Sequence, residues 1–226
     1  RCLQLTKQIP VKDDLKQLEQ FNSAEISDAL DALKIEGVLL GIKPLSANQK
    51  IIGPAYTIQY AAYEKSPTAF NNASNYIDDV PCQAVIVLDN AGRTDCTVWG
   101  GLLTECAKQK GITGTVIHGA VRDVDAIKES HYPVYCCDQT MRSGKNRVHK
   151  TAQQCELTIG CVTISPGDII FADNLGVIVI PKQQLKVIIA KAKNIQACEA
   201  AIHTAVQQGM PLAAAREQFH YATPWV

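Results

Sequence analysis

The chain has no excess charge and no long apolar run. Its 22 Lys and Arg balance its 22 Asp and Glu, so the formal net charge is zero at neutral pH. No cluster of basic residues stands out, so a nucleic-acid-binding surface is not indicated. The longest apolar runs have the length of a strand, which is too short for a helix to cross a bilayer. We therefore expect a soluble protein whose partners include neither nucleic acid nor a membrane.

Cysteine pairs of the kind that bind zinc are also lacking. The chain has nine Cys, an odd number, without a CxxC pair or the spacing of a zinc module. Cys136 and Cys137 are neighbours and make poor disulfide partners for each other. Cys82, Cys106 and Cys161 stand in apolar patterns, in which a thiol behaves as a small hydrophobic group. We expect reduced, buried thiols in a cytoplasmic protein.

The sequence shows no initiator Met, no signal-peptide pattern, no internal repeat and no recognisable linker. The missing Met suggests a processed chain or a domain cut from a longer protein. A chain of 226 residues is long enough to bury a sizeable core. We expect a single α/β domain over residues 1–226, in which helices flank a β-rich middle.

Apolar residues at helical spacing predict helices at both ends of the chain. Asn22 followed by Glu25 is the pattern of a capping box, so a helix should cover residues 22–33. Residues 182–208 predict a long amphipathic helix, and residues 212–220 a short one. Between them, helices are expected at 100–111 and 124–130. Strands are expected at 51–60, 84–88, 114–119, 134–137, 156–159, 162–165, 169–172 and 177–180.

The segment Gly100-Gly101-Leu102-Leu103 places two glycines at the start of a helix. The first amide groups of a helix lack internal partners, so such a segment can bind a carboxylate or a phosphate. Strand 84–88, this helix and strand 114–119 form a βαβ unit, in which ligands bind at the carboxyl ends of the strands. Arg122 and Asp123 follow the second strand and should open on the same edge. Arg122 suits a substrate carboxylate, and Asp123 suits Mg²⁺ or Mn²⁺.

A purely structural interpretation of this pair is also open. Asp123 could be only the N-cap of the helix at 124–130, and Arg122 could pair with Asp125 or Asp95. His118, at the end of the preceding strand, is a candidate general base, but a ring bonded to backbone is the preferred interpretation. Two further carboxylates, those of Asp168 and Asp173, are expected to bond their own backbone in turns.

The sequence resembles the RraA-like family in WGGLLTECAKQKGITGTVIHGAVRDVDAI, preceded by SAEISDAL and followed by PVYCCD and SPGDIIFADNLGVIVIP. Three blocks within these segments are specific in combination: Gly-Gly-Leu-Leu, Gly-Ala-Val-Arg-Asp and Pro-Gly-Asp…Ala-Asp-Asn…Gly-Val. The resemblance extends from about Phe21 to about Gly209. The family includes the 4-hydroxy-4-methyl-2-oxoglutarate/4-carboxy-4-hydroxy-2-oxoadipate aldolases and the regulators of ribonuclease E activity.

The resemblance implies a swivelling β/β/α fold and a homotrimer or hexamer with its site at a subunit interface. It implies a pyruvate-releasing aldolase that acts on small 2-oxo acids with a divalent metal, Mg²⁺ or Mn²⁺, held by Asp123. Decarboxylation of oxaloacetate should accompany the aldolase reaction, because both produce the same enolate. The regulators typically lose the Asp of the Arg-Asp pair, so Arg122 and Asp123 favour an enzyme. A non-catalytic protein that binds a ribonuclease or another partner is the alternative.

The resemblance also assigns residues around this pair. Arg122 and Asp123 are the expected catalytic residues, and the substrate-binding residues are Gly100, Gly101, Leu102, Leu103 and Arg122. Many aldolase members have an acidic residue where this chain has Gly101, and Glu105 is the nearest substitute. Glu199, on the long C-terminal helix, is a further candidate through the subunit interface.

Overall fold

A computed structural model describes residues 12–65 and 74–224 of the chain. The chain divides into two compact units, one formed by both ends (up to Ile35 and from Lys182) and one by Glu36–Pro181. The predicted α/β class agrees with the helices and strands observed. Whether residues 1–226 form a single domain, as expected, stays a prediction.

The central unit is built on a mixed sheet with the strand order β1-β12-β11-β3-β4-β6-β7-β2. Strand β5 pairs with β6, strand β8 pairs with β3, and β9 and β10 form a separate antiparallel pair. The strand bounds are β1 Val38–Leu39, β2 Lys43–Pro44, β3 Ile51–Ala62, β4 Val85–Asp89, β5 Thr97–Trp99, β6 Gly114–Val121, β7 Val134–Gln139, β8 Val148–Gln153, β9 Leu157–Ile159, β10 Val162–Ile164, β11 Ile169–Asp173 and β12 Gly176–Ile180.

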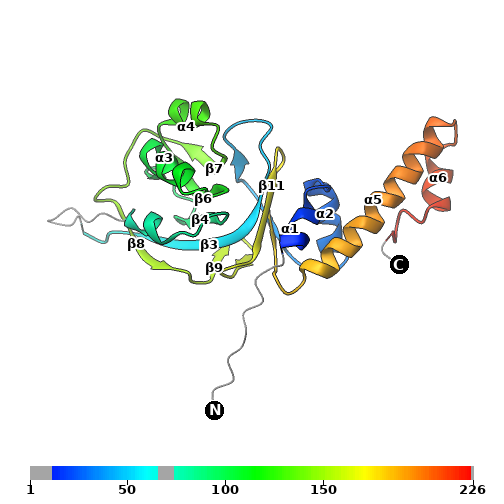
Figure 1. Ribbon diagram of the computed structural model, residues 1–226, viewed down its shortest axis with the longest axis horizontal. Coiled ribbons are helices and arrows are strands. Elements are labelled where there is room, and N and C mark those ends of the chain that lie inside the picture. The colour runs from blue at the N-terminus through cyan, green and yellow to red at the C-terminus, as the bar shows by residue number, and fades with distance from the viewer. Residues whose placement is uncertain (1–11, 66–73, 225–226) are drawn as a thin grey trace, which may run out of the picture. The chain divides into compact units, whose positions relative to one another are not determined.

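Strands β3, β4, β6 and β7 are parallel neighbours, so their carboxyl ends share one edge of the sheet. Helix α3 (Gly101–Gln109) joins the β4–β5 segment to β6, which confirms the predicted βαβ unit. Helix α4 (Val124–Ser130) follows β6, and the short η1 helix (Asn75–Asp79) precedes β4. Helices α3 and α4 lie together on one face of the sheet (Figure 1).

Two apolar cores occupy the two faces of this sheet, as alternation along the strands requires. One core contains Ile86, Leu88 and Ile117, and side chains of α3 and α4 pack against it. The other contains Val85, Val87 and Val116, together with residues of β9 to β12. The parallel strands are therefore apolar on both faces, which explains their continuous hydrophobic sequences.

The terminal unit contains α1 (Lys12–Leu18), α2 (Ser23–Asp31), α5 (Leu185–Gln207) and α6 (Leu212–Gln218). Helices α1 and α2 pack on α5, and α6 folds back on its C-terminal half. The predicted capping box is confirmed: Asn22 Oδ1 accepts the amide of Glu25 at 3.0 Å, and Glu25 Oε2 accepts the amide of Asn22 at 2.8 Å.

The expected burial of the cysteine side chains is wrong in two cases. All eight cysteines of the described residues are free thiols, but Cys82 and Cys161 are exposed. Cys82 lies in the turn that precedes β4, and Cys161 lies in the turn between β9 and β10. A neighbouring apolar sequence does not bury a side chain that stands at the turn itself, where the chain reverses at the surface.

The turn aspartates agree with the sequence predictions, whereas several strands were missed. Asp168 Oδ2 accepts the amide of Ser165 at 2.8 Å, and Asp173 Oδ1 accepts that of Leu175 at 3.0 Å, so both turn predictions are confirmed. Strands β1, β2, β5 and β8 were not predicted: the first three have only two or three residues each, and β8 has the largely polar sequence VHKTAQ.

The capping box gives a stability prediction. Asn22→Ala should lower the free energy of unfolding by about 1 kcal/mol, because the amide of Glu25 loses its acceptor. Asn22→Ser, which keeps a side-chain acceptor, should lose only a small part of this. Urea titration followed by far-UV circular dichroism measures both. Equal losses in the two variants would show that the cap does not stabilise α2.

Candidate active site at the ends of β5 and β6

The two predicted site segments meet at the edge where β5 and β6 end. Strand β5 leads directly into Gly100 and pairs with the last residues of β6, which lead into Arg122. The amide of Arg122 donates to the carbonyl of Trp99 at 3.1 Å and joins the two segments. The glycine segment thus follows β5, a short strand that the sequence did not reveal, rather than β4 itself.

The Asp123 carboxylate binds the start of α3. Its Oδ2 accepts the amide of Gly101 at 2.9 Å, from a residue 22 positions earlier in the chain. The N-cap residue of α3 is Gly100, which has no side chain to accept this bond. Asp123 therefore supplies, through tertiary contact, the cap that α3 lacks in its own sequence.

Asp123 does not cap the helix that follows it. It occupies the N-cap position of α4, but its backbone is in the left-handed region at φ 57° and its side chain makes no capping bond there. The interpretation of Asp123 as only the N-cap of α4 is therefore wrong, because its carboxylate is bonded to another helix. The Gly101 amide, expected to bind substrate, is bonded to Asp123 in this structure.

The amides of Leu102 and Leu103 remain available at this helix start. No hydrogen bond of theirs occurs within residues 12–65 and 74–224, and the third residue of a helix still has no internal partner. The Leu102 side chain is 80% exposed at the same place. The first turn of α3 therefore presents two donors and an apolar side chain to whatever binds this edge.

Arg122 lies beside Asp123 and is also accessible. Its Nε is 3.6 Å from Asp123 Oδ2, and the two side chains are 44% and 46% exposed. The expected alternative partner, Asp95, is instead bound by Arg93 through Nε at 3.0 Å and Nη2 at 2.7 Å. The pairing of Arg122 with Asp95 is therefore wrong, because Arg93 is two residues from Asp95 and forms the shorter, two-bonded contact.

The Asp123 carboxylate limits the space for a side chain at Gly100. A Cβ on Gly100 would lie 2.7 Å from Asp123 Oδ2 and 3.2 Å from Arg122 Cγ. The backbone at Gly100 is extended, so the requirement for glycine is one of space. At Gly101 the nearest atom to such a Cβ would be 3.5 Å away, an ordinary contact.

The donor groups present fit a divalent cation that keeps most of its own water. Asp123 is the carboxylate at the ends of β5 and β6, and nowhere in the described parts of the chain do three or more His, Cys, Asp or Glu gather as a metal site. Mg²⁺ and Mn²⁺ are commonly held by one or two carboxylates with water and substrate oxygens. The expected substitute, Glu105, is exposed and accepts a hydrogen bond from Gln109 at 2.9 Å along α3 rather than approaching Asp123.

His118 belongs to a polar row that crosses three strands in register. Gln59, Asp89 and His118 stand at paired positions of β3, β4 and β6. His118 Nδ1 lies 2.7 Å from Asp89 Oδ1, and Gln59 Nε2 donates to Asp89 Oδ2 at 2.9 Å. The prediction that the His118 ring bonds to backbone is therefore wrong. This pair could not be predicted from the sequence, because it depends on strand register.

The row lies apart from the Arg122 site. His118 precedes Arg122 by four residues, and β6 is irregular between Ile117 and Ala120, so their Cα atoms are at most about 13 Å apart. Asp89 Oδ1 also accepts the amide of Ala91 at 2.8 Å and so fixes the turn after β4. Burial favours the neutral form of Asp89, but the hydrogen bonds it accepts, first that of His118, outweigh burial and lower its pKa.

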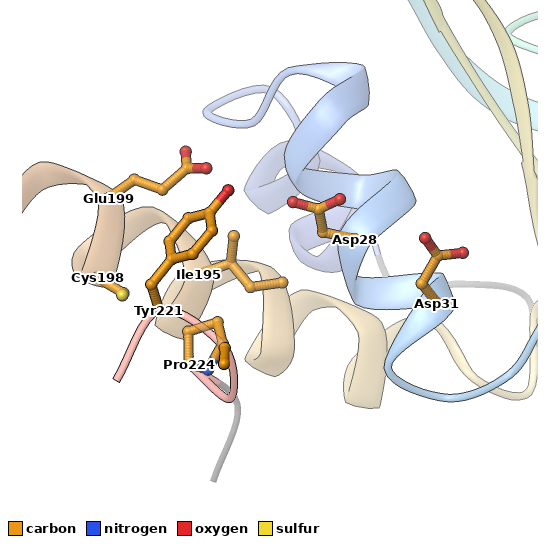
Figure 2. Close-up of a pocket in the computed structure, with 8 residues that line it drawn as sticks. Asp28, Asp31, Ile195, Cys198, Glu199, Tyr221 and Pro224 are labelled. Carbon is orange, nitrogen blue, oxygen red and sulfur yellow. The ribbon is translucent and has the colours of Figure 1, made fainter. Parts of the chain in front are cut away.

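The terminal unit holds a separate hollow of about 260 Å³. Figure 2 shows the carboxylates of Asp28 and Glu199 on either side of the Tyr221 ring, with Ile195 beneath. Burial, and then repulsion from Asp28 and Glu25, raises the pKa of Glu199. Glu199 is thus a member of an acidic group within the terminal unit. The cluster of Gly100, Gly101, Arg122 and Asp123 is formed by the central unit alone.

None of the helices within residues 12–65 and 74–224 is both long and apolar enough to span a membrane.

A family model described as "RraA-like: Aldolase/RraA" matches residues 23–179. The Legionella pneumophila protein DlpA is 58% identical over 212 residues, which is 94% of this chain but 34% of DlpA, so the chain spans about a third of that relative. A Halalkalibacterium halodurans protein named "Putative 4-hydroxy-4-methyl-2-oxoglutarate aldolase" is 34% identical, over 88% of this chain and 90% of its own.

Two solved structures resemble this chain in fold. A crystal structure of an "uncharacterized protein" from Pseudomonas syringae pv. tomato superposes with a TM-score of 0.83 at 38% identity, covering 91% of this chain and 98% of that one. RraAS2 of Streptomyces coelicolor, described as an unusual member of the RNase ES inhibitor RraA protein family, gives a TM-score of 0.77 at 26% identity, over 84% and 96% of the two chains.

The glycine pair gives a matched stability test. Gly100→Ala should lower the free energy of unfolding by about 1–3 kcal/mol, because its Cβ displaces the Asp123 carboxylate from the Gly101 amide. Gly101→Ala should cost less, since its Cβ finds ordinary contacts. Thermal unfolding of both variants measures the difference. A loss at Gly101 as large as that at Gly100 would contradict the proposed crowding at Asp123.

The lowered pKa of Asp89 gives a pH prediction. A carboxyl with a depressed pKa in the folded state stabilises the fold above its unfolded pKa of about 4, and this stabilisation is lost as the pH falls further. Asp89→Asn should therefore cost about 1–3 kcal/mol at pH 7, and the difference from wild type should shrink below about pH 4. Urea titrations between pH 7 and pH 3 test this. A difference that is constant with pH would exclude the ionised carboxylate as the cause.

Proposed function

The chain belongs to the RraA-like family, and on that premise we propose that it is a divalent-metal-dependent lyase that cleaves 4-hydroxy-2-oxo acids to pyruvate. Family membership confirms the resemblance drawn from the sequence and the RraA-like α/β fold, with its β-rich core and flanking helices. The observation that carries the proposal is the accessible Arg122–Asp123 pair bonded to the start of α3. The enzyme would also decarboxylate oxaloacetate.

Arg122 is proposed to bind the 2-oxo-acid end of the substrate. Its guanidinium can hold a carboxylate through two parallel hydrogen bonds, and the free amides of Leu102 and Leu103 can complete the contact. A substrate held in this way has its 2-oxo oxygen close to a fixed positive charge. The site residues include no lysine, so the proposal does not involve a Schiff base.

Cleavage breaks the bond between C3 and C4. The 4-hydroxyl loses its proton and becomes a carbonyl, while the electron pair of the broken bond forms the enolate of pyruvate, which is then protonated at C3. Arg122 stabilises the negative charge where it develops, which lowers the barrier more than it strengthens substrate binding. Asp123 would hold Mg²⁺ or Mn²⁺, which, when bound, supplies Lewis-acid stabilisation of the same charge. Oxaloacetate yields the same enolate by loss of CO₂.

A homotrimer or hexamer with the site at a subunit interface is part of the proposal. Leu102 is 80% exposed beside the site in the isolated chain, and a neighbouring copy would cover it. Sedimentation or light scattering measures the oligomeric state in solution.

Pyruvate release from oxaloacetate and from 4-hydroxy-4-methyl-2-oxoglutarate tests the proposal with Mg²⁺, Mn²⁺ or chelator. Wild type should release pyruvate only with metal, and Asp123→Ala should reduce the rate at least about a hundredfold. Asp123→Asn separates the roles of this residue: it keeps an acceptor for the Gly101 amide but lacks the charge. It should be inactive yet about 1 kcal/mol more stable than Asp123→Ala.

Two outcomes would contradict the proposed enzymatic activity. One is wild-type protein that releases no pyruvate under any of these conditions, which would favour a non-catalytic binding protein of the ribonuclease-regulator kind. The other is an Asp123→Asn variant as active as wild type, because the negative charge would then have no part in the reaction.

A further inference from the structure

The segment that follows β7 is fixed against both strands of the site. The amide of Thr140 donates to the carbonyl of Val121, the residue before Arg122, at 3.0 Å. The amide of Thr97, in β5, donates to the carbonyl of Arg142 at 3.0 Å. The backbone of Arg142 is thereby anchored to the strand that leads into the glycine segment, and its neighbours to the strand that leads into Arg122.

The turn beyond Arg142 is rigid. A Cβ on Gly144 would collide with the carbonyl oxygen of Thr97, so the two segments are in close contact. The carbonyl of Gly144 accepts the amides of Arg147 and Val148 at 2.9 and 3.0 Å, and the Arg147 guanidinium bonds back to the carbonyl of Ser143 at 3.0 Å. Arg142 therefore projects from a preorganised turn, which reduces the cost of ordering it around a ligand.

Four arginines lie on these segments, and within residues 12–65 and 74–224 Arg142 and Arg147 have no ionic partner; the Arg147 guanidinium is bonded to the carbonyl of Ser143. Arg93 is held by Asp95 in a two-bonded ion pair, and Arg122 lies beside Asp123. Arg142 is exposed, and no carboxylate of the described residues lies within ion-pair distance of it. The pKa of Asp95 is lowered chiefly by its hydrogen bonds from Arg93 and to a lesser extent by the charge of Arg142.

The proposed substrates are dicarboxylates, and one guanidinium cannot account for both ends. If Arg122 holds the 2-oxo-acid end, the second carboxylate lies several bonds further along the substrate. On the basis of the proposed function, we infer that Arg142 binds this distal carboxylate and gives the enzyme its preference for dicarboxylic over monocarboxylic 4-hydroxy-2-oxo acids. Its fork of donors matches a carboxylate, and its backbone is anchored to the strand that leads into the glycine segment.

The test compares two substrates that differ in the distal carboxylate. 4-Hydroxy-4-methyl-2-oxoglutarate carries it, and 4-hydroxy-2-oxopentanoate lacks it. Arg142→Gln should lower kcat/KM for the first about 10- to 100-fold, the effect of a lost charge-assisted pair, and leave the second within about twofold. Arg142→Lys keeps the charge without the fork and should be intermediate. Lys128→Gln, near the C-terminal end of α4, removes the same charge away from the site and should change neither value.

A binding measurement makes the test independent of turnover. Calorimetric titration with 2-oxoglutarate, in the presence of Mg²⁺, should show weaker binding to Arg142→Gln than to wild type, while 2-oxobutanoate should bind both equally. An active wild type combined with an equal loss for both substrates, or with no loss, overturns the role of Arg142 and leaves the proposed function standing. A wild type that cleaves neither substrate overturns the proposed function. The titrations then decide whether Arg142 binds the distal carboxylate. Equal affinities of wild type and Arg142→Gln for 2-oxoglutarate would overturn this role of Arg142.

Discussion

A hydrogen bond between the Asp123 carboxylate and the Gly101 amide holds the candidate site together. It joins the end of β6 to the start of α3, two segments that are also linked by the pairing of β5 with β6 and by the bond from the Arg122 amide to the Trp99 carbonyl. The helix needs an acceptor at its start, and Gly100 offers none. The same bond leaves one face of the carboxylate and the Arg122 side chain open to solvent. Structure and proposed chemistry therefore depend on one side chain, and a substitution there tests both.

Much of the fold follows from local sequence. The capping box at Asn22 and Glu25, the continuous apolar strands and the turn aspartates Asp168 and Asp173 each depend on residues within a few positions of one another. Hydrophobic periodicity located the long helix α5 to within a few residues. The convergence of the glycine segment and the Arg-Asp pair was also predictable, because parallel strands of a βαβ unit end at one edge.

The errors concern partners far apart in the chain. That Asp123 caps α3 rather than α4 and that His118 bonds to Asp89 are both settled by register or by a loop path. No local pattern encodes such pairings, since the candidate partners are of the same chemical type. Exposure at Cys82 and Cys161 escaped prediction for a related reason: an apolar neighbourhood in the sequence gives no position within a turn.

The backbone of Asp123 constrains how this site can change. At φ 57° it lies in a region that most side chains adopt only at a cost, and that Gly, Asn and Asp tolerate best. Of these, Asn keeps the acceptor for α3, and Gly keeps only the backbone shape. A single substitution to Asn therefore removes the negative charge while the main chain and the acceptor for the Gly101 amide stay in place. The fold can lose its proposed chemistry at little structural cost, so a lineage of such chains could pass from catalysis to binding in one step without first losing its architecture.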